Sequence, residues 1–524
     1  MPAALQTALL FLLILGTSGF SATYDLIIRN GRIIDGSGNP SFRSDVAVKN
    51  GKIAWIGKTE QKAVQEIDAN GMVVAPGFID VHTHAEDILQ RPEAQNFARM
   101  GVTTVVMGNC GSSALRVGEF FRNVEATNVS INVASLIGHG TVRETAMHGN
   151  FDRAPTSEEM MQMKELVEQG MRDGAVGLST GLIYLPGTFA TTEEIIELAK
   201  VASKYDGLYA SHMRDEGKEI FKSLNEVFRI AREAHIRAEV SHIKLSGKLN
   251  WGRAERVLAA IDKARADGLD ITQDQYVYTA SSTGIAQLIP EEYREGGKFR
   301  ERLAQERSKI VEAMKEKLHK AGRKNYSYAV IADYKYDGTL NGLNIMEAAR
   351  KTHGSSSLGS QVDLILDIQN HGGASGVFHG MSEDDLKVFL THPNTMIASD
   401  SGVRAFEEGV PHPRGYGNNA RVLEHYVSEL KLLRLEDAIR RMTSLPASTF
   451  RLKGRGELRE GNAADLVIFD PAKVHEETSF KEPHHYASGF EWVLVNGVPV
   501  VQKDKYTGKK PGQVVRREAG NSLD

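Results

Sequence analysis

Residues 73–84 read VVAPGFIDVHTH, and this stretch determines how the rest of the chain is interpreted. It is an apolar run, interrupted by Pro76 and Gly77, that ends in His82 and His84. In an extended backbone, side chains two residues apart point to the same side, so both imidazoles face one way. Strands buried on both faces read as continuous apolar runs, and barrel enzymes carry their catalytic groups where such strands end. The stretch predicts a metal-binding pair at a strand end, although the motif alone also fits two solvated histidines on a surface strand.

The middle of the chain, from about residue 73 to 452, alternates strand-like apolar runs with helical patterns. Helical patterns such as residues 156–173 and 191–205 lie between most of the strand-like runs. Such alternation is typical of repeated βα units. Together with the opening run, the strand candidates are residues 102–110, 130–138, 175–181, 207–213, 237–243, 270–278 and 394–400. The sequence therefore predicts an α/β fold with a (β/α)8 TIM barrel.

Both ends of the chain carry hairpin signals. Asn-Gly pairs at 30–31, 50–51 and 496–497 lie between short β-rich runs. We predict one small β-sandwich domain built from both chain ends, with halves at residues 23–72 and 453–524. A charged helical stretch at about 284–343 is predicted to be an insertion in the barrel, either a lid over the site or a surface excursion.

Composition narrows the class of protein. Charged residues make up 25% of the chain and the net charge is −4, so we expect no nucleic-acid partner.

Residues 8–16 read ALLFLLILG and precede small residues, which predicts a signal peptide over residues 1–22, although no Lys or Arg precedes the run. We expect export to the periplasm or beyond and no membrane attachment after cleavage; the alternatives are an uncleaved anchor or a buried helix. Cys110 is the only cysteine, which excludes an intramolecular disulfide.

Six residues of metal-ligand type lie at or near the ends of five predicted strands. Matching positions on so many strands are difficult to obtain by accident. A thiolate with imidazoles suits zinc, and a carboxylate can complete or bridge a second ion. The six residues are His82, His84, Cys110, His212, His242 and Asp400.

Longer motifs surround these residues, including APGFIDVHTH, GVTTVVMGNCG, GLSTGLIYLPGTFATTEEI, SHMRDEG, SHIKLSG, HPRGYGNNARVL and LREGNAADLVIFDP. With these motifs the chain resembles the amidohydrolase superfamily, and most closely its N-acyl-D-amino-acid deacylase (D-aminoacylase) branch. The resemblance covers nearly all of the chain after the predicted signal peptide. GNCG and HPR are the most specific motifs, since related hydantoinases and dihydroorotases usually contribute a carboxylated Lys instead of a Cys.

The resemblance implies a role for each candidate residue. One tight zinc ion would be held by Cys110, His212 and His242, and a second, weaker site would be formed by His82, His84 and Asp400. Asp400 would also be the catalytic residue that accepts a proton from water and passes it to the leaving amine. The implied substrate contacts are Tyr184, Lys244, Tyr276, Ser282 and Arg414.

A carboxylate on the substrate would suit the planar guanidinium of Arg414, with Lys244 and Tyr184 as helpers. The residue types alone also allow Tyr184 to be a core residue, and allow Lys244 and Arg414 to be solvated or paired with acids. The chain reads YVY at 276–278 where the family usually reads YPY.

The expected function is zinc-dependent hydrolysis of N-acyl-D-amino acids, with that small molecule as the expected partner. Two alternatives stay open. One is a related enzyme that acts on dipeptides ending in a D-residue or on cyclic amides, and the other is a non-catalytic barrel used for binding or assembly.

Overall fold

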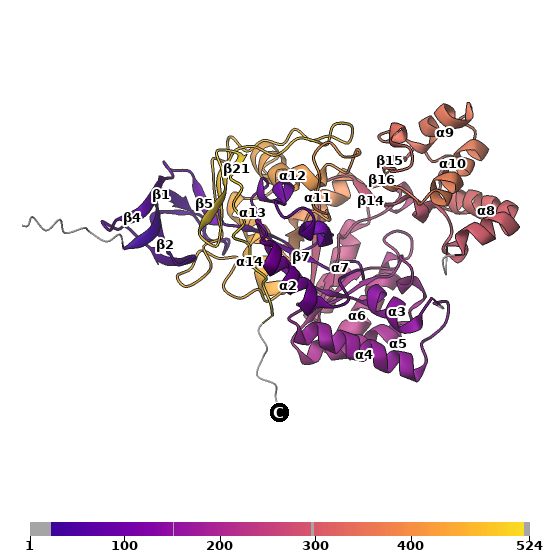
Figure 1. Cartoon of the computed structure of the whole chain (residues 1–524), viewed down its shortest axis with the longest axis horizontal. Coiled ribbons are helices and arrows are strands. Elements are labelled where there is room, and N and C mark those ends of the chain that lie inside the picture. The colour runs from indigo at the N-terminus through magenta and orange to yellow at the C-terminus, as the bar shows by residue number, and fades with distance from the viewer. Residues whose placement is uncertain (1–22, 150, 295–297, 518–524) are drawn as a thin grey trace, which may run out of the picture.

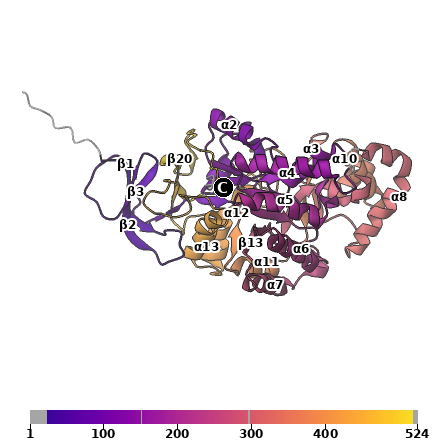
Figure 2. The same ribbon diagram turned by 90° about the horizontal axis from the view of Figure 1, so that it is seen from below.

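The computed structural model describes residues 23–149, 151–294 and 298–517. Its parts lie in a row, with a β domain at one end, a barrel in the middle and an inserted unit at the other end (Figures 1 and 2). The predicted signal peptide, residues 1–22, lies outside the described residues. Among the described residues, no helix has the length and apolar character needed to cross a membrane.

Both chain ends contribute strands to the β domain, as predicted. In the described chain, nine strands form one sheet in the order β21-β20-β19-β18-β5-β1-β2-β3, with β4 beside β1. The halves meet where β18 pairs antiparallel with β5, and Ile28, Val46 and Leu466 share one apolar core. The strands are β1 (Tyr24–Ile33), β2 (Phe42–Lys49), β3 (Lys52–Ile56), β4 (Ala63–Asp68), β5 (Val73–Pro76), β18 (Leu466–Phe469), β19 (Phe490–Val495), β20 (Val498–Gln502) and β21 (Lys505–Tyr506).

The predicted barrel is present, and every predicted barrel strand contains an observed one. Its neighbouring strands pair in parallel. The barrel closes where the Asp400 amide donates to the His82 carbonyl at 2.9 Å and the His84 amide donates to the Ser401 carbonyl at 2.9 Å. The strands are β6 (Phe78–Asp80), β7 (Val102–Met107), β8 (Asn132–Ser135), β9 (Ile137–Gly138), β10 (Gly177–Gly181), β11 (Leu208–His212), β12 (Arg237–Val240), β13 (Ile271–Gln275) and β17 (Thr395–Ile397).

Helices cover the outside of the barrel (Figure 2). Their local sequence explains their limits: α4 begins after a capping box made by Thr156 and Glu159, and α6 buries Ile220, Leu224 and Val227 on one face. The helices are η1 (Glu86–Leu89), α1 (Gln95–Ala98), α2 (Val117–Thr127), α3 (His139–Met147), α4 (Ser157–Arg172), α5 (Thr192–Lys204), α6 (Ile220–Glu233), α7 (Ala254–Ala266), α11 (Glu383–Thr391), α12 (Arg414–Arg421), η8 (Val422–Glu429), α13 (Leu435–Met442) and α14 (Ser444–Thr449).

The inserted unit is larger than the predicted stretch of about 284–343. It consists of β14 (Ala280–Gly284), α8 (Phe299–Lys320), β15 (Ala329–Asp333), α9 (Ile345–His353), α10 (Leu358–Asn370) and β16 (Ser375–His379). Because β14 pairs antiparallel with β16, with Ala280 opposite His379, the unit ends only at β16. It has its own apolar core, and β14, which directly follows barrel strand β13, places Ser282 and Thr283 beside the candidate site.

Candidate active site

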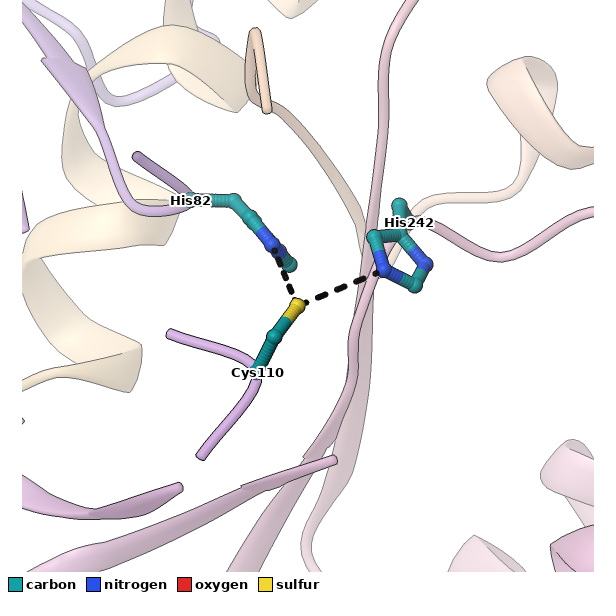
Figure 3. Close-up of side chains that lie close together, drawn as sticks. All are labelled: His82, Cys110 and His242. Atoms are coloured by element: carbon teal, nitrogen blue, oxygen red, sulfur yellow. Dashed lines mark hydrogen bonds between the residues drawn. The ribbon is translucent and has the colours of Figure 1, made fainter. Parts of the chain in front are cut away.

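The six predicted ligand residues meet at the carboxyl end of the barrel. Cys110, after β7, lies between His82 and His242 (Figure 3). Its Sγ is 3.4 Å from His82 Nε2, 3.7 Å from His242 Nε2 and 3.7 Å from His212 Nδ1. On the other side of His82, Asp400 Oδ1 lies 3.8 Å from His82 Nε2 and 3.2 Å from His84 Nε2. The strand ends therefore bring all six side chains into one connected cluster.

The loops that carry these side chains adopt an uncommon backbone conformation. Cys110, His242 and Asp400 have φ values of 53°, 37° and 51°. Such left-handed residues other than glycine cost about 1–3 kcal/mol each, and they persist only where the surrounding structure fixes them. For Cys110 that support comes from Asn109, whose side-chain amide donates to the Val106 carbonyl at 3.0 Å and the Val81 carbonyl at 3.2 Å.

Charge in the cluster suits a cation. Burial opposes ionisation of Cys110, yet the neighbouring imidazoles, His82 first, lower the pKa of its thiol well below the usual value. Burial also opposes ionisation of Asp400, but Arg414 and then His82 bring the pKa of its carboxyl well below the usual value. The site therefore offers a thiolate and a carboxylate next to imidazole nitrogens.

Two acidic residues outside the predicted set orient the imidazoles. Asp274 Oδ2 lies 3.1 Å from His82 Nδ1, and Glu216 Oε1 lies 3.0 Å from His242 Nδ1. With these nitrogens engaged, the Nε2 atoms of both rings face Cys110. Carboxylates behind imidazoles commonly fix the ring orientation of metal ligands. The sequence holds a partial signal for Glu216, which follows His212 by four residues in SHMRDEG; Asp274 lies unmarked within a strand.

The donor atoms fit zinc. Ligand atoms lie within 4.8 Å of one another in three groups, formed by His82, Cys110 and His242, by His82, His84 and Asp400, and by His212, Glu216 and His242. A thiolate with imidazoles is a typical zinc donor set. His82 belongs to two of the groups, so the predicted division of ligands between a tight and a weaker site stays a prediction.

Two cavities open at the cluster and meet at His84 and Ser282. One, of about 340 Å³, is also lined by Cys110 and Tyr184. The other, of about 400 Å³, is also lined by Asp400 and Arg414. Three predicted substrate-binding residues, Tyr184, Ser282 and Arg414, therefore border space next to the cluster.

The other two predicted substrate contacts are not among the residues that line these cavities. Lys244 is buried, and its ammonium group donates to Glu216 Oε1 at 2.5 Å and lies 2.9 Å from His242 Nδ1. Tyr276 is also buried and donates its hydroxyl to Met381 Sδ at 3.5 Å. Its ring lies 4.4 Å below the guanidinium of Arg414. In this structure both residues support neighbouring side chains.

Arg414 is itself paired within the protein. The residue is buried at the start of α12, and its Nη1 lies 2.9 Å from Asp400 Oδ2. This ion pair joins the proposed proton carrier to the proposed carboxylate-binding residue. Tyr184 is half-buried and its hydroxyl accepts a hydrogen bond from Thr283 Oγ1 at 3.3 Å. Burial raises the pKa of Tyr184 well above its usual value, so the phenol keeps its proton.

Several known proteins are similar to this chain over nearly its whole length. D-aminoacylase of Alcaligenes xylosoxydans xylosoxydans is 37% identical over 95% of this chain and 99% of its own length. The structure of N-acyl-D-glutamate deacylase from Bordetella bronchiseptica, in complex with zinc and a phosphonate mimic of the tetrahedral intermediate, is 34% identical, with a TM-score of 0.81 over 94% of this chain and 99% of that one. A D-aminoacylase structure that addresses one-metal activation and second-metal attenuation is 33% identical, with a TM-score of 0.81 over 94% of this chain and 100% of that one. A model of the amidohydrolase family matches residues 65–501. This chain belongs to the amidohydrolase family.

Proposed function

We propose that this chain is a zinc-dependent hydrolase that cleaves the amide bond of N-acyl-D-amino acids, releasing a carboxylate and a free D-amino acid. The observation that carries the proposal is the convergence of Cys110, His82 and His242 beside the ion pair of Asp400 and Arg414. Such a substrate needs activated water, a proton carrier and a partner for its carboxylate, and these residues supply the corresponding groups. The relatives named as D-aminoacylase and N-acyl-D-glutamate deacylase support the choice of substrate.

The residues that would hold zinc are Cys110 and the three imidazoles around it, with His84 and Asp400 offering a second position. When bound, zinc supplies Lewis acidity, which activates water at neutral pH and polarises a carbonyl. Asp400 is ionised, so its carboxylate can accept a proton from the attacking water. The same carboxyl group then returns this proton to the nitrogen of the leaving amine.

Binding groups lie on both sides of this carboxylate. Arg414 presents a planar guanidinium whose donors can bind a substrate carboxylate while one nitrogen stays close to Asp400. Tyr184 keeps its proton and borders the cavity next to Cys110, so it can donate to the acyl oxygen. The α-carboxylate and the acyl group then lie on opposite sides of the bond that is cleaved.

A substrate panel tests the proposal. The zinc-loaded protein is assayed with N-acetyl D- and L-amino acids, dipeptides ending in D-residues, and cyclic amides, with metal analysis of the same sample. We expect hydrolysis of N-acetyl-D-amino acids that is lost with a chelator and restored by zinc. Faster hydrolysis of cyclic amides or dipeptides would replace the proposed substrate class, and a metal-free protein without hydrolase activity would point to a binding role.

We also propose that the protein is exported. The proposal is supported by the apolar run at residues 8–16 and the small residues after it. Fractionation of expressing cells, with N-terminal sequencing of the recovered protein, tests it. A cytoplasmic protein that retains residues 1–22 would contradict it.

A further inference from the structure

The cavity of about 400 Å³ next to His84 is lined by charged side chains, most of which are paired with one another. Arg91 lies 3.3 Å from Asp87 and 2.7 Å from Glu408. Lys335 lies 2.9 Å from Asp333 and 2.5 Å from Glu408. These cations are neutralised inside the protein and leave little charge for a ligand.

Arg404 lines the same cavity and differs from these cations. In the part of the chain that the structure describes, no carboxylate lies within 4.0 Å of its guanidinium, and its side chain makes one hydrogen bond, from Nε to Ser401 Oγ at 3.3 Å. Burial and the charge of Arg414 lower the pKa of Arg404. An arginine keeps its charge even so, so the half-buried guanidinium is a positive group without a direct counter-ion in the cavity wall.

The structure fixes Arg404 in this place. Its amide donates to Asn96 Oδ1 at 3.1 Å, and Asn96 Nδ2 donates to the carbonyls of Gly402 at 3.2 Å and Gly415 at 2.9 Å. A Cβ atom at Gly415 would lie 3.3 Å from Arg404 Cγ and 2.7 Å from Ser401 Oγ. The side chain of Arg404 thus packs against the first turn of α12, directly after Arg414. A charged group held in advance loses little freedom when it binds a ligand.

We propose that Arg404 binds a second carboxylate of the substrate, so that the enzyme takes N-acyl-D-amino acids with acidic side chains. This inference rests on the proposed function. The α-carboxylate would occupy Arg414, and the side-chain carboxylate of a D-glutamate or D-aspartate derivative would occupy Arg404 on the same wall of the cavity. An apolar side chain would instead remove water from the Arg404 guanidinium without replacing its hydrogen bonds, which is unfavourable.

The experiment compares kcat/KM for N-acetyl-D-glutamate and N-acetyl-D-aspartate with kcat/KM for N-acetyl-D-leucine. We expect the wild type to prefer an acidic substrate. Arg404→Gln should lose about 10- to 100-fold on that substrate, the usual effect of losing a hydrogen bond to a charged group, and change less than about threefold on the leucine derivative. Arg404→Lys, which keeps the charge, should recover part of the loss. Lys335→Gln is the matched control, because it removes a paired cation from the same cavity. It should change kcat/KM for acidic and neutral substrates by the same factor.

The outcomes separate this inference from the proposed function. Equal losses on acidic and neutral substrates in Arg404→Gln would assign Arg404 to the α-carboxylate or to the fold and would overturn the inference. A wild type that cleaves N-acetyl-D-leucine but neither acidic substrate would also overturn it, while the proposed function would stand. If zinc-loaded wild type cleaves no N-acyl-D-amino acid, the proposed function fails and this inference fails with it.

Discussion

Asp274 is the residue whose substitution tests the metal centre most directly. Its Oδ2 accepts from His82 Nδ1 at 3.1 Å, and its Oδ1 accepts from the His242 amide at 3.0 Å. Asp274→Asn keeps the shape, but an amide has one oxygen, so its NH2 group must face one of these two donors. In either orientation of the amide, one buried hydrogen bond is lost, because the NH2 group then faces another N–H donor.

The size of the effect follows from these contacts. Loss of a residue that orients a metal ligand typically weakens metal affinity by about 10- to 100-fold, or about 1.4–2.8 kcal/mol. The unsatisfied donor should also cost about 1–3 kcal/mol of folding stability. We therefore expect Asp274→Asn to fold, to bind zinc at least tenfold more weakly, and to unfold at a lower temperature even without zinc.

Competition against a chromogenic chelator measures the zinc affinity, and thermal unfolding with and without zinc measures stability. Asp262→Asn is the matched control: Asp262 lies on α7, is exposed and accepts from His392 Nε2 at 2.9 Å, a histidine outside the ligand cluster. That variant should bind zinc like the wild type. If Asp274→Asn binds zinc within twofold of the Asp262→Asn control, Asp274 does not orient a ligand and our view of the centre is wrong.

The remaining predictions concern the ligands, the proton carrier and the substrate. Cys110→Ala should abolish tight zinc binding while the fold survives, because a methyl group offers neither charge nor a metal bond; full zinc content in the purified variant would contradict this. Asp400→Asn should keep metal yet lose kcat by orders of magnitude, since an amide cannot accept the proton, and near-normal kcat would remove Asp400 from the mechanism. Arg414→Lys should lose at least about tenfold in kcat/KM, because Lys lacks the planar two-point contact. Blocking the substrate carboxylate as an amide should then add little further loss, whereas additive losses would show that Arg414 does not contact that group. Gly181→Ala would place a Cβ 2.7 Å from Tyr184 Cδ2 and against the Cys110 carbonyl, so it should cost about 1–3 kcal/mol and weaken zinc binding. Gly338→Ala is the control for both measurements, because its Cβ would make only an ordinary contact with Asn341 Nδ2 at 3.8 Å.

The barrel and its ligand cluster could be predicted because one rule links them. Apolar runs mark strands buried on both faces, and in a barrel the carboxyl ends of all strands meet on one rim. Polar residues at those ends, such as Cys110 and His212, must then lie close together. Neither the identity of the loops nor the exact strand limits is needed for this conclusion.

Contacts behind the ligands could not be predicted in the same way. Whether Asp274 faces His82 depends on the pairing of β12 with β13, where Val240 lies opposite Gln273, and a shift of one residue would turn Asp274 to the other face. The ion pair of Lys244 with Glu216 could not be predicted either, because it depends on the geometry of two loops. The end of the inserted unit also could not be predicted, because it depends on the pairing of β14 with β16, which lies far from it in the sequence.

The backbone segments that carry the candidate ligands His82 and Asp400 also close the barrel. The amide of Asp400 donates to the His82 carbonyl and so joins the last barrel strand to the first, while both side chains point into the cluster. Asp400 is also one of the residues held at positive φ, a conformation that is retained only while the surrounding hydrogen bonds are intact. A zinc ion held by His82 and its neighbours in the cluster would therefore stabilise the closing contact, and the closed barrel keeps the side chains of His82 and Asp400 in position for it. Because binding to the native state alone adds to its stability, zinc should raise the free energy of unfolding of the barrel by an amount that disappears together with the affinity in variants of the cluster.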